Sequence, residues 1–298
     1  MKIILSILCL LSFAGFAQRG LPADTNVTDA SGKKVGFWIE SAGLNRVQGW
    51  YQNGLKEGNW VAYHAGGTPS SIEYYSKGKK NGLVLSMDIH GKMTKEEYYT
   101  NDSLDGNSKA YHDNMRLKSD INYKMGRVHG TYKVCYIDGT MQEFANYKNG
   151  KKDGICKWFY STGEVLTEYT YRDGKLQGLQ NNFYKSGKKQ SEVTASNNEF
   201  EGLYKEFYET GELKYSINYV KGKKQGALKE TSADGKIILR DCIYLNDELN
   251  GAYKENHASG KPKSSGKYVM GKKEGDWKEW NEEGKLTKRK YKNDAEIK

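Results

Sequence analysis

The chain has 298 residues and a formal net charge of +10, with 34 glycines, 23 tyrosines and only 3 prolines. Hydrophobic residues make up 37% of it, which excludes one large compact core for a chain of this length. The aromatic share of 12% excludes a disordered chain, because disordered segments are poor in aromatic residues. So much glycine and tyrosine favours many strands joined by many turns.

The first 17 residues have the pattern of a secretory signal peptide. Lys2 precedes a mostly apolar run over residues 3–13, which is too short to span a bilayer as a helix. Gly15 and Ala17 are the small residues that a cleavage after Ala17 needs. We therefore expect an exported chain that begins at Gln18 and has no transmembrane segment.

Two alternatives remain open for this segment, a buried N-terminal strand and a lipoprotein anchored through Cys9. Export would place the mature chain in the periplasm, on the cell surface or in the medium of a bacterium with an outer membrane. We expect residues 18–33 to form a mobile leader, because they lack the pattern that fills residues 34–298.

That pattern is an internal repeat, which is marked by one glycine in every unit. The spacing is 24 residues in most units, 22 in the first and 25 near the end. Eleven units follow, of which the last is truncated. The anchor glycines are Gly36, Gly58, Gly82, Gly106, Gly130, Gly154, Gly178, Gly202, Gly226, Gly251 and Gly275.

Other positions recur at fixed distances from the anchor glycine, which is counted as zero. Glycine is common at +9 and +20, and large residues are common at +2, +5 and +17. Aromatic and β-branched residues dominate two runs per unit and alternate with period two, as strands require. The mainly structural aromatic ladder consists of Trp60, Tyr63, Tyr75, Tyr99, Tyr123, Tyr147, Phe159, Tyr171, Phe207, Tyr219, Tyr268 and Trp277.

Each unit is therefore predicted to be one β-hairpin with glycine turns. A lone hairpin is marginally stable in water, so neighbouring hairpins must share an apolar face. The fold class is all-β: an elongated, open and twisted single antiparallel meander of about eleven stacked hairpins. Two departures stand out. Met115 replaces the +9 glycine, so we expect Asn114 to take the left-handed conformation, and Gln180 at +2 makes its unit a soft point.

Pairs of lysines recur just before four of the anchor glycines. Stacked hairpins would place them along one edge of the sheet and make it a basic surface, although the same residues serve solubility and edge protection. This candidate basic edge consists of Lys79, Lys80, Lys151, Lys152, Lys223, Lys224, Lys272 and Lys273.

The sequence contains no recognisable catalytic, cofactor or metal motif. Cys156 occupies a position that is aromatic in other units, which predicts a packed apolar role. The five histidines, His64, His90, His112, His129 and His257, are interpreted as solvated loop residues. We therefore expect no enzyme activity and no cofactor. Nucleic-acid binding is disfavoured, because acidic residues interrupt the basic runs and export removes the partner.

The units resemble the bacterial variant form of MORN repeats. The unit from Gly154 shows the pattern in Phe159, Tyr160, Gly163, Tyr171 and Gly174. The resemblance covers residues 28–293 and implies stacked hairpins with an aromatic groove, an interaction module without catalytic residues, and acidic phospholipids as proposed ligands. Related bacterial chains resemble the YwqK-family antitoxins, which implies neutralisation of a toxin.

Three functions follow from these observations. The first is a non-catalytic binding or scaffolding module for a protein partner in the cell envelope. The second is binding of an anionic lipid or polysaccharide surface through the basic edge. The third, neutralisation of a toxin protein, rests on the resemblance alone.

Overall fold

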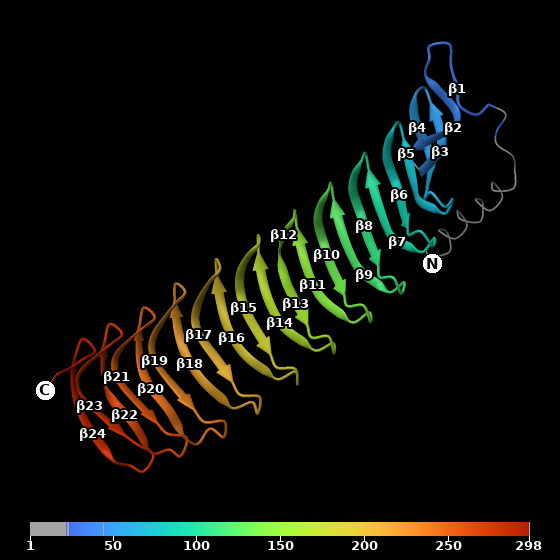
Figure 1. The fold of residues 1–298 in the computed structure, drawn as a ribbon. Coiled ribbons are helices and arrows are strands. Elements are labelled where there is room, and N and C mark those ends of the chain that lie inside the picture. The colour runs from blue at the N-terminus through green and yellow to red at the C-terminus, as the bar shows by residue number, and fades with distance from the viewer. Residues whose placement is uncertain (1–21, 23, 44, 298) are drawn as a thin grey trace. The chain divides into compact units, whose positions relative to one another are not determined.

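The computed structural model describes residues 22, 24–43 and 45–297. These residues form 25 strands and no helix, and the strands make an open antiparallel meander (Figure 1). The predicted all-β hairpin repeat is confirmed. The predicted signal peptide, residues 1–17, lies outside the described residues. Unit 1 comprises Met1–Leu117 with Asn122–Arg127, and unit 2 comprises Lys118–Ile121 with Val128–Lys298.

In unit 1, each strand from β2 to β7 pairs antiparallel with the next one. Within the predicted leader, Val27 of β1 pairs with Val35, and the backbone NH of Asn26 donates to the Phe37 carbonyl at 2.9 Å. This part of the leader is therefore attached to the sheet. The strands are β1 (Val27–Thr28), β2 (Lys34–Ala42), β3 (Asn45–Gln52), β4 (Leu55–Tyr63), β5 (Pro69–Ser76), β6 (Lys79–Met87), β7 (Met93–Thr100) and β8 (Ser103–Tyr111).

Unit 2 repeats the same hairpin, and β9 (Leu117–Lys124) contributes residues to both units. Its core cluster lies around Ile217, Leu228 and Cys242. The strands are β10 (Arg127–Cys135), β11 (Met141–Lys148), β12 (Lys151–Lys152), β13 (Gly154–Phe159), β14 (Val165–Arg172), β15 (Lys175–Phe183), β16 (Lys189–Ser196), β17 (Glu199–Phe207), β18 (Leu213–Val220), β19 (Lys223–Thr231), β20 (Ile238–Leu245), β21 (Glu248–Asn256), β22 (Pro262–Val269), β23 (Lys272–Trp280), β24 (Leu286–Lys292) and β25 (Ala295–Ile297).

The anchor glycines lie inside strands, which differs from the expectation that the glycines mark turns. Gly58 sits in β4 with φ 70°, where the pairing steps from Gln48↔Val61 to Trp50↔Glu57. Two extra residues on one strand between these pairs make a bulge, and glycine supplies the positive φ without a steric cost. The same register shift recurs beside other anchor glycines, as between Glu73 and Tyr75 and between Ser265 and Lys267.

The turns agree with the predicted glycines at +9 and +20. At +20, Asn149 and Gly150 have φ 51° and 82°, which is the backbone of a two-residue type I′ hairpin turn. At +9, Met115 is the exception. Met115 itself has φ 66°, so the prediction that Asn114 takes the left-handed conformation is wrong. The turn geometry imposes the left-handed conformation at +9, whichever residue occupies that position.

Gln180 replaces the aromatic residue at +2 and is 2% exposed. Its Nε2 donates to the carbonyls of Thr170 (3.2 Å) and Gly178 (2.9 Å). In unit 1, the indole Nε1 of Trp60 donates to the Trp50 carbonyl at 3.1 Å in the same way. The amide thus reproduces the hydrogen bond of the indole but not the packing of the indole ring, so this repeat stays a predicted soft point.

Among residues 24–43 and 45–297, no helix is long and apolar enough to cross a membrane.

Candidate functional site

Alternation along the strands defines two faces in each unit. The inner face carries positions +2, +4 and +17, and the outer face carries the residues that alternate with them along each strand. On the inner face Trp60 and Trp277 are 3% and 1% exposed, and their rings pack on Tyr75 and Tyr268 with centroids 6.4 and 5.0 Å apart. These packed rings take the place of a globular core.

The predicted aromatic ladder is divided between the two faces. The residues at +17 are half-buried on the inner face, as Tyr147 against Tyr132 illustrates with centroids 5.4 Å apart. At position +5, Tyr63 falls on the outer face. There Gln48 Nε2 donates to the Tyr63 hydroxyl at 2.9 Å, and the Arg46 guanidinium lies 4.5 Å from the ring centre. The remaining predicted members are half-buried on their strands: Tyr99, Tyr123, Phe159, Tyr171, Phe207 and Tyr219.

The lysine pairs are also divided, because adjacent strand residues point to opposite faces. The first lysine of every pair is exposed, and the second is half-buried on the inner face. The exposed ones are Lys79, Lys151, Lys223 and Lys272, and the inner ones are Lys80, Lys152, Lys224 and Lys273.

The inner lysines are already occupied by neighbouring side chains. Lys152 Nζ lies 2.9 Å from Glu143 and 4.2 Å from the centre of the Trp158 ring. Lys273 Nζ lies 3.0 Å from Glu279 and 4.4 Å from the Trp277 ring centre. Such ion pairs and cation–π contacts hold these lysines against the sheet. Only the four exposed lysines therefore remain available to bind an anionic surface.

A row of glutamates follows the inner face of unit 2. Each stands four residues after an anchor glycine, and each contacts a cation at 2.6 to 3.0 Å. The row consists of Glu206 with Lys214, Glu230 with Arg240, Glu255 with Lys263, and Glu279 with Lys273. This glutamate row was not predicted, although the recurrence of glutamate at +4 in the sequence is a signal that marks it.

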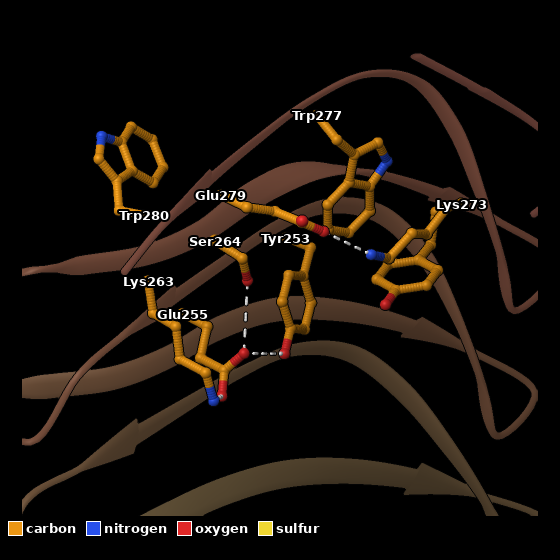
Figure 2. A pocket seen from close by; sticks show the side chains of 9 residues that line it. Tyr253, Glu255, Lys263, Ser264, Lys273, Trp277, Glu279 and Trp280 are labelled. Carbon is orange, nitrogen blue, oxygen red and sulfur yellow. Dashed lines mark hydrogen bonds and ion pairs between the residues drawn. The ribbon is translucent and has the colours of Figure 1, made fainter. Parts of the chain in front are cut away.

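A groove of about 340 Å³ opens on the inner face at the end of this row (Figure 2). Tyr253, Glu255 and Lys263 line one side, and Lys273 and Glu279 line the other. Glu255 accepts hydrogen bonds from the hydroxyls of Tyr253 (3.2 Å) and Ser264 (3.3 Å). The groove therefore combines two cations, two carboxylates and aromatic rings, and it carries no net charge of its own.

Electrostatics keep the Glu255 carboxylate of this groove ionised. Burial acts to raise the pKa of Glu255, but the hydrogen bond and charge of Lys263 and the Tyr253 hydroxyl outweigh it, so the pKa lies below its ordinary value. Burial and the Glu255 carboxylate raise the pKa of Tyr253. At neutral pH Glu255 is thus charged and Tyr253 is a neutral phenol, which suits recognition more than proton transfer.

The three cysteines in the described part of the chain are buried, and no disulfide joins them. Cys156 is fully buried, which confirms its predicted apolar role, and burial raises the pKa of its thiol. In the part of the chain that the structure describes, no three histidine, cysteine or acidic side chains cluster as a metal site would require.

The interpretation of the histidines as solvated loop residues is wrong for His64, His129 and His257. Nε2 of His64 and of His257 donates to the carbonyls of Met87 (3.2 Å) and Trp280 (3.1 Å). Tyrosine hydroxyls fill this position in other repeats. Nδ1 of His129 accepts from the backbone NH of Asn149 at 3.3 Å. These histidines join one repeat to the next.

The hairpin geometry agrees with a comparison to known families. Residues 152–173, 200–221 and 273–293 match the family model described as the MORN repeat variant. The match to the MORN repeat variant thus covers three places in unit 2. Each matched segment begins at an inner-face residue, Lys152, Phe200 or Lys273, and spans one hairpin. MORN repeats are commonly binding or scaffolding modules and are typically non-catalytic.

Other comparisons add nothing to this assignment. No curated protein matches the chain. A porin-like protein from Bacteroides uniformis ATCC 8492 is 11% identical, with 87% of this chain and 89% of that chain covered and a TM-score of 0.19. The TcdB2-TccC3-Cdc42 structure is 9% identical, with 90% and 16% covered and a TM-score of 0.18. Scores this low carry no argument about fold or function.

Proposed function

We propose that the chain is a non-catalytic binding or scaffolding module that holds a protein partner on the inner face of unit 2, in the cell envelope after export. The mixed charge of the groove is the observation that favours a protein as the partner. A uniformly anionic surface gains little from a face where Glu255 and Glu279 accompany Lys263 and Lys273. A polypeptide offers both charges and apolar side chains, so it can complement all of these groups.

A photo-crosslinking amino acid at Ser264 tests the partner. Ser264 lines the groove, and we expect the crosslinker there to capture one protein from the envelope fraction at both low and high salt. Lys278 provides the matched control, because it is exposed on the outer face of the neighbouring strand β23. Equal capture from both positions would contradict the proposal. The Lys263→Glu variant should abolish capture at Ser264, since it places two carboxylates side by side.

The anionic surface stays a second candidate because Lys79, Lys151, Lys223 and Lys272 are exposed at one repeat position. Replacing these four by glutamine should remove salt-sensitive binding to vesicles that contain an anionic phospholipid. Replacing the inner lysines Lys80, Lys152, Lys224 and Lys273 should instead reduce stability, because they are held by glutamates and rings. Loss of vesicle binding in the first variant alone would favour this candidate over a protein partner.

Export rests on the pattern of residues 1–17, with Gly15 and Ala17 before the expected cleavage. Mass spectrometry of the chain recovered from its native cells checks this part of the proposal. We expect the N-terminus to be Gln18. A chain that still begins at Met1 and stays in the cytoplasmic fraction would remove the envelope from the proposal and leave the binding groove unaffected.

A further inference from the structure

Three exposed aromatic side chains follow one another on the outer face of unit 1. Trp50, Tyr74 and Tyr98 are 47%, 40% and 38% exposed. They lie on β3, β5 and β7, one on every second strand and 24 residues apart in sequence. Two strand spacings separate successive rings by ~9.6 Å. We call these three residues the outer aromatic row.

The rings are seated on the sheet and do not project freely. The Tyr74 ring covers Gly82, where a Cβ would come within 3.2 Å of the ring's Cδ1. A Cβ on Gly106 would come within 3.0 Å of the Tyr98 Cβ and 3.7 Å of its ring Cγ, and Trp50 packs edge-on against Phe37 with centroids 5.7 Å apart. Rings that are fixed before binding lose little conformational entropy on contact with a ligand.

Each ring has a neutral hydrogen-bonding neighbour on the same face. Two residues further along each strand stand Gln52, Ser76 and Thr100, and side chains two apart in a strand share a face. The same two positions in unit 2 hold pairs such as Asn146 with Lys148 and Thr170 with Arg172. The combination of ring and neutral polar group thus distinguishes unit 1.

The size of the row argues for a narrow ligand. The exposed parts of three aromatic side chains amount to roughly 250 Å², given 150–250 Å² for a whole one. A stable protein–protein interface needs about 800 Å² from each partner. The row is too small for a second copy of the chain, but its width suits a single polymer strand.

A neutral polysaccharide has the chemistry that fits. The flat C–H face of a sugar ring packs on an aromatic face, and its hydroxyls accept and donate hydrogen bonds at the ring edge. In an extended β-1,4-linked glycan, alternate sugars present the same face, at a repeat close to two strand spacings. We propose that Trp50, Tyr74 and Tyr98 form a stacking platform for a neutral, extended β-linked glycan. This site is separate from the groove proposed for the protein partner.

Calorimetric titration of the purified protein with cellohexaose and with chitohexaose tests this proposal. We expect binding to at least one of these β-linked oligosaccharides, with the same affinity at low and high salt, and no binding to the α-linked maltohexaose. Each single Trp50→Thr, Tyr74→Thr or Tyr98→Thr change should weaken binding about tenfold through loss of one stacked ring. The triple variant should show no binding.

Threonine is chosen because the chain itself carries it at this position as Thr170 and Thr194, so the variants should fold. Tyr74→Phe should retain binding, since it keeps the ring. Ile155→Ala and Leu179→Ala alter exposed outer-face residues of unit 2 and should leave affinity unchanged. The proposal fails if neither β-linked oligosaccharide binds, or if the triple variant binds as well as the unmodified protein. A dimer in sedimentation that the triple variant abolishes would also overturn it.

Discussion

The indole of Trp277 occupies the space that a side chain at residue 266 would need. A Cβ on Gly266 would lie 2.3 Å from Cδ2 of Trp277. Trp60 stands over Gly49 in the same relationship, at 2.4 Å. In each case the glycine belongs to the neighbouring repeat, so the largest ring on the inner face is paired with the smallest residue.

Gly266→Ala should therefore destabilise the protein by about 3 kcal/mol, at the upper end of the range for overpacking. Gly266 has an ordinary φ, so the loss would arise from the clash with Trp277 and not from backbone strain. Chemical denaturation measures it, and in a Trp277→Leu background the penalty should largely disappear.

Gly66→Ala is the matched control, because Gly66 also has an ordinary φ and a Cβ there would meet nothing within 4 Å. That substitution should be neutral or slightly stabilising. If Gly266→Ala were as harmless as Gly66→Ala, the close packing of Trp277 on Gly266 would not be a stabilising feature.

Met115→Gly should stabilise the protein by about 0.5 kcal/mol. Relief of the left-handed strain at φ 66° is worth about 1–2 kcal/mol. The greater conformational entropy of glycine in the unfolded chain offsets part of this stabilisation. Gly163→Ala tests the same position in another repeat, where only the φ of 102° opposes a Cβ, and should destabilise. Equal effects of the two substitutions in denaturant titrations would rule out strain as the cause.

Alkaline pH should weaken unit 2 through its tyrosines. Burial and the nearby Glu143 raise the pKa of Tyr147 from 10.0 to about 12. Because the folded state holds the phenol proton more tightly, this contribution to stability is complete below pH 10 and is lost as the pH rises toward 12. Melting followed by circular dichroism should show a shallower alkaline loss for Tyr147→Phe, and identical pH profiles would contradict this assignment.

His257→Phe should destabilise by about 1 kcal/mol, because the Trp280 carbonyl loses its donor. His257→Tyr should keep full stability, since a tyrosine hydroxyl makes this bond in other repeats, as Tyr160 does to the Phe183 carbonyl at 3.0 Å. Thermal denaturation of both variants gives the comparison. A phenylalanine as stable as the tyrosine would show that ring packing alone matters here.

The repeat, its period and its strand character could be predicted from the sequence, because glycine spacing and period-two alternation are local properties of the chain. The same holds for Cys156, whose position is aromatic in other repeats. The surroundings of each lysine in the lysine pairs could not be predicted from local sequence. Lys151 and Lys152 are neighbours in sequence, but the pleat sends one to solvent and the other to Glu143 and Trp158.

The candidate site was less predictable than the fold. The groove combines residues from β21, β22 and β23, and its charges are arranged by the register of those strands. Glu255 meets Lys263 across a hairpin, a contact that depends on the turn and on the bulge. The outer aromatic row was missed because Trp50, Tyr74 and Tyr98 differ from the residues at their position in later repeats, so no consensus marks them.

The sequence by itself determined the hairpin unit, its number of residues and its turns, since these depend on glycine conformation and side-chain alternation within one repeat. Tertiary structure alone decided which face each side chain shares with the next repeat. It thereby decided that Gly266 makes room for Trp277, that histidines replace tyrosines as donors between repeats, and that three rings remain exposed. The physical reason is that packing between repeats depends on strand register and bulges, which place residues about 24 positions apart in direct contact.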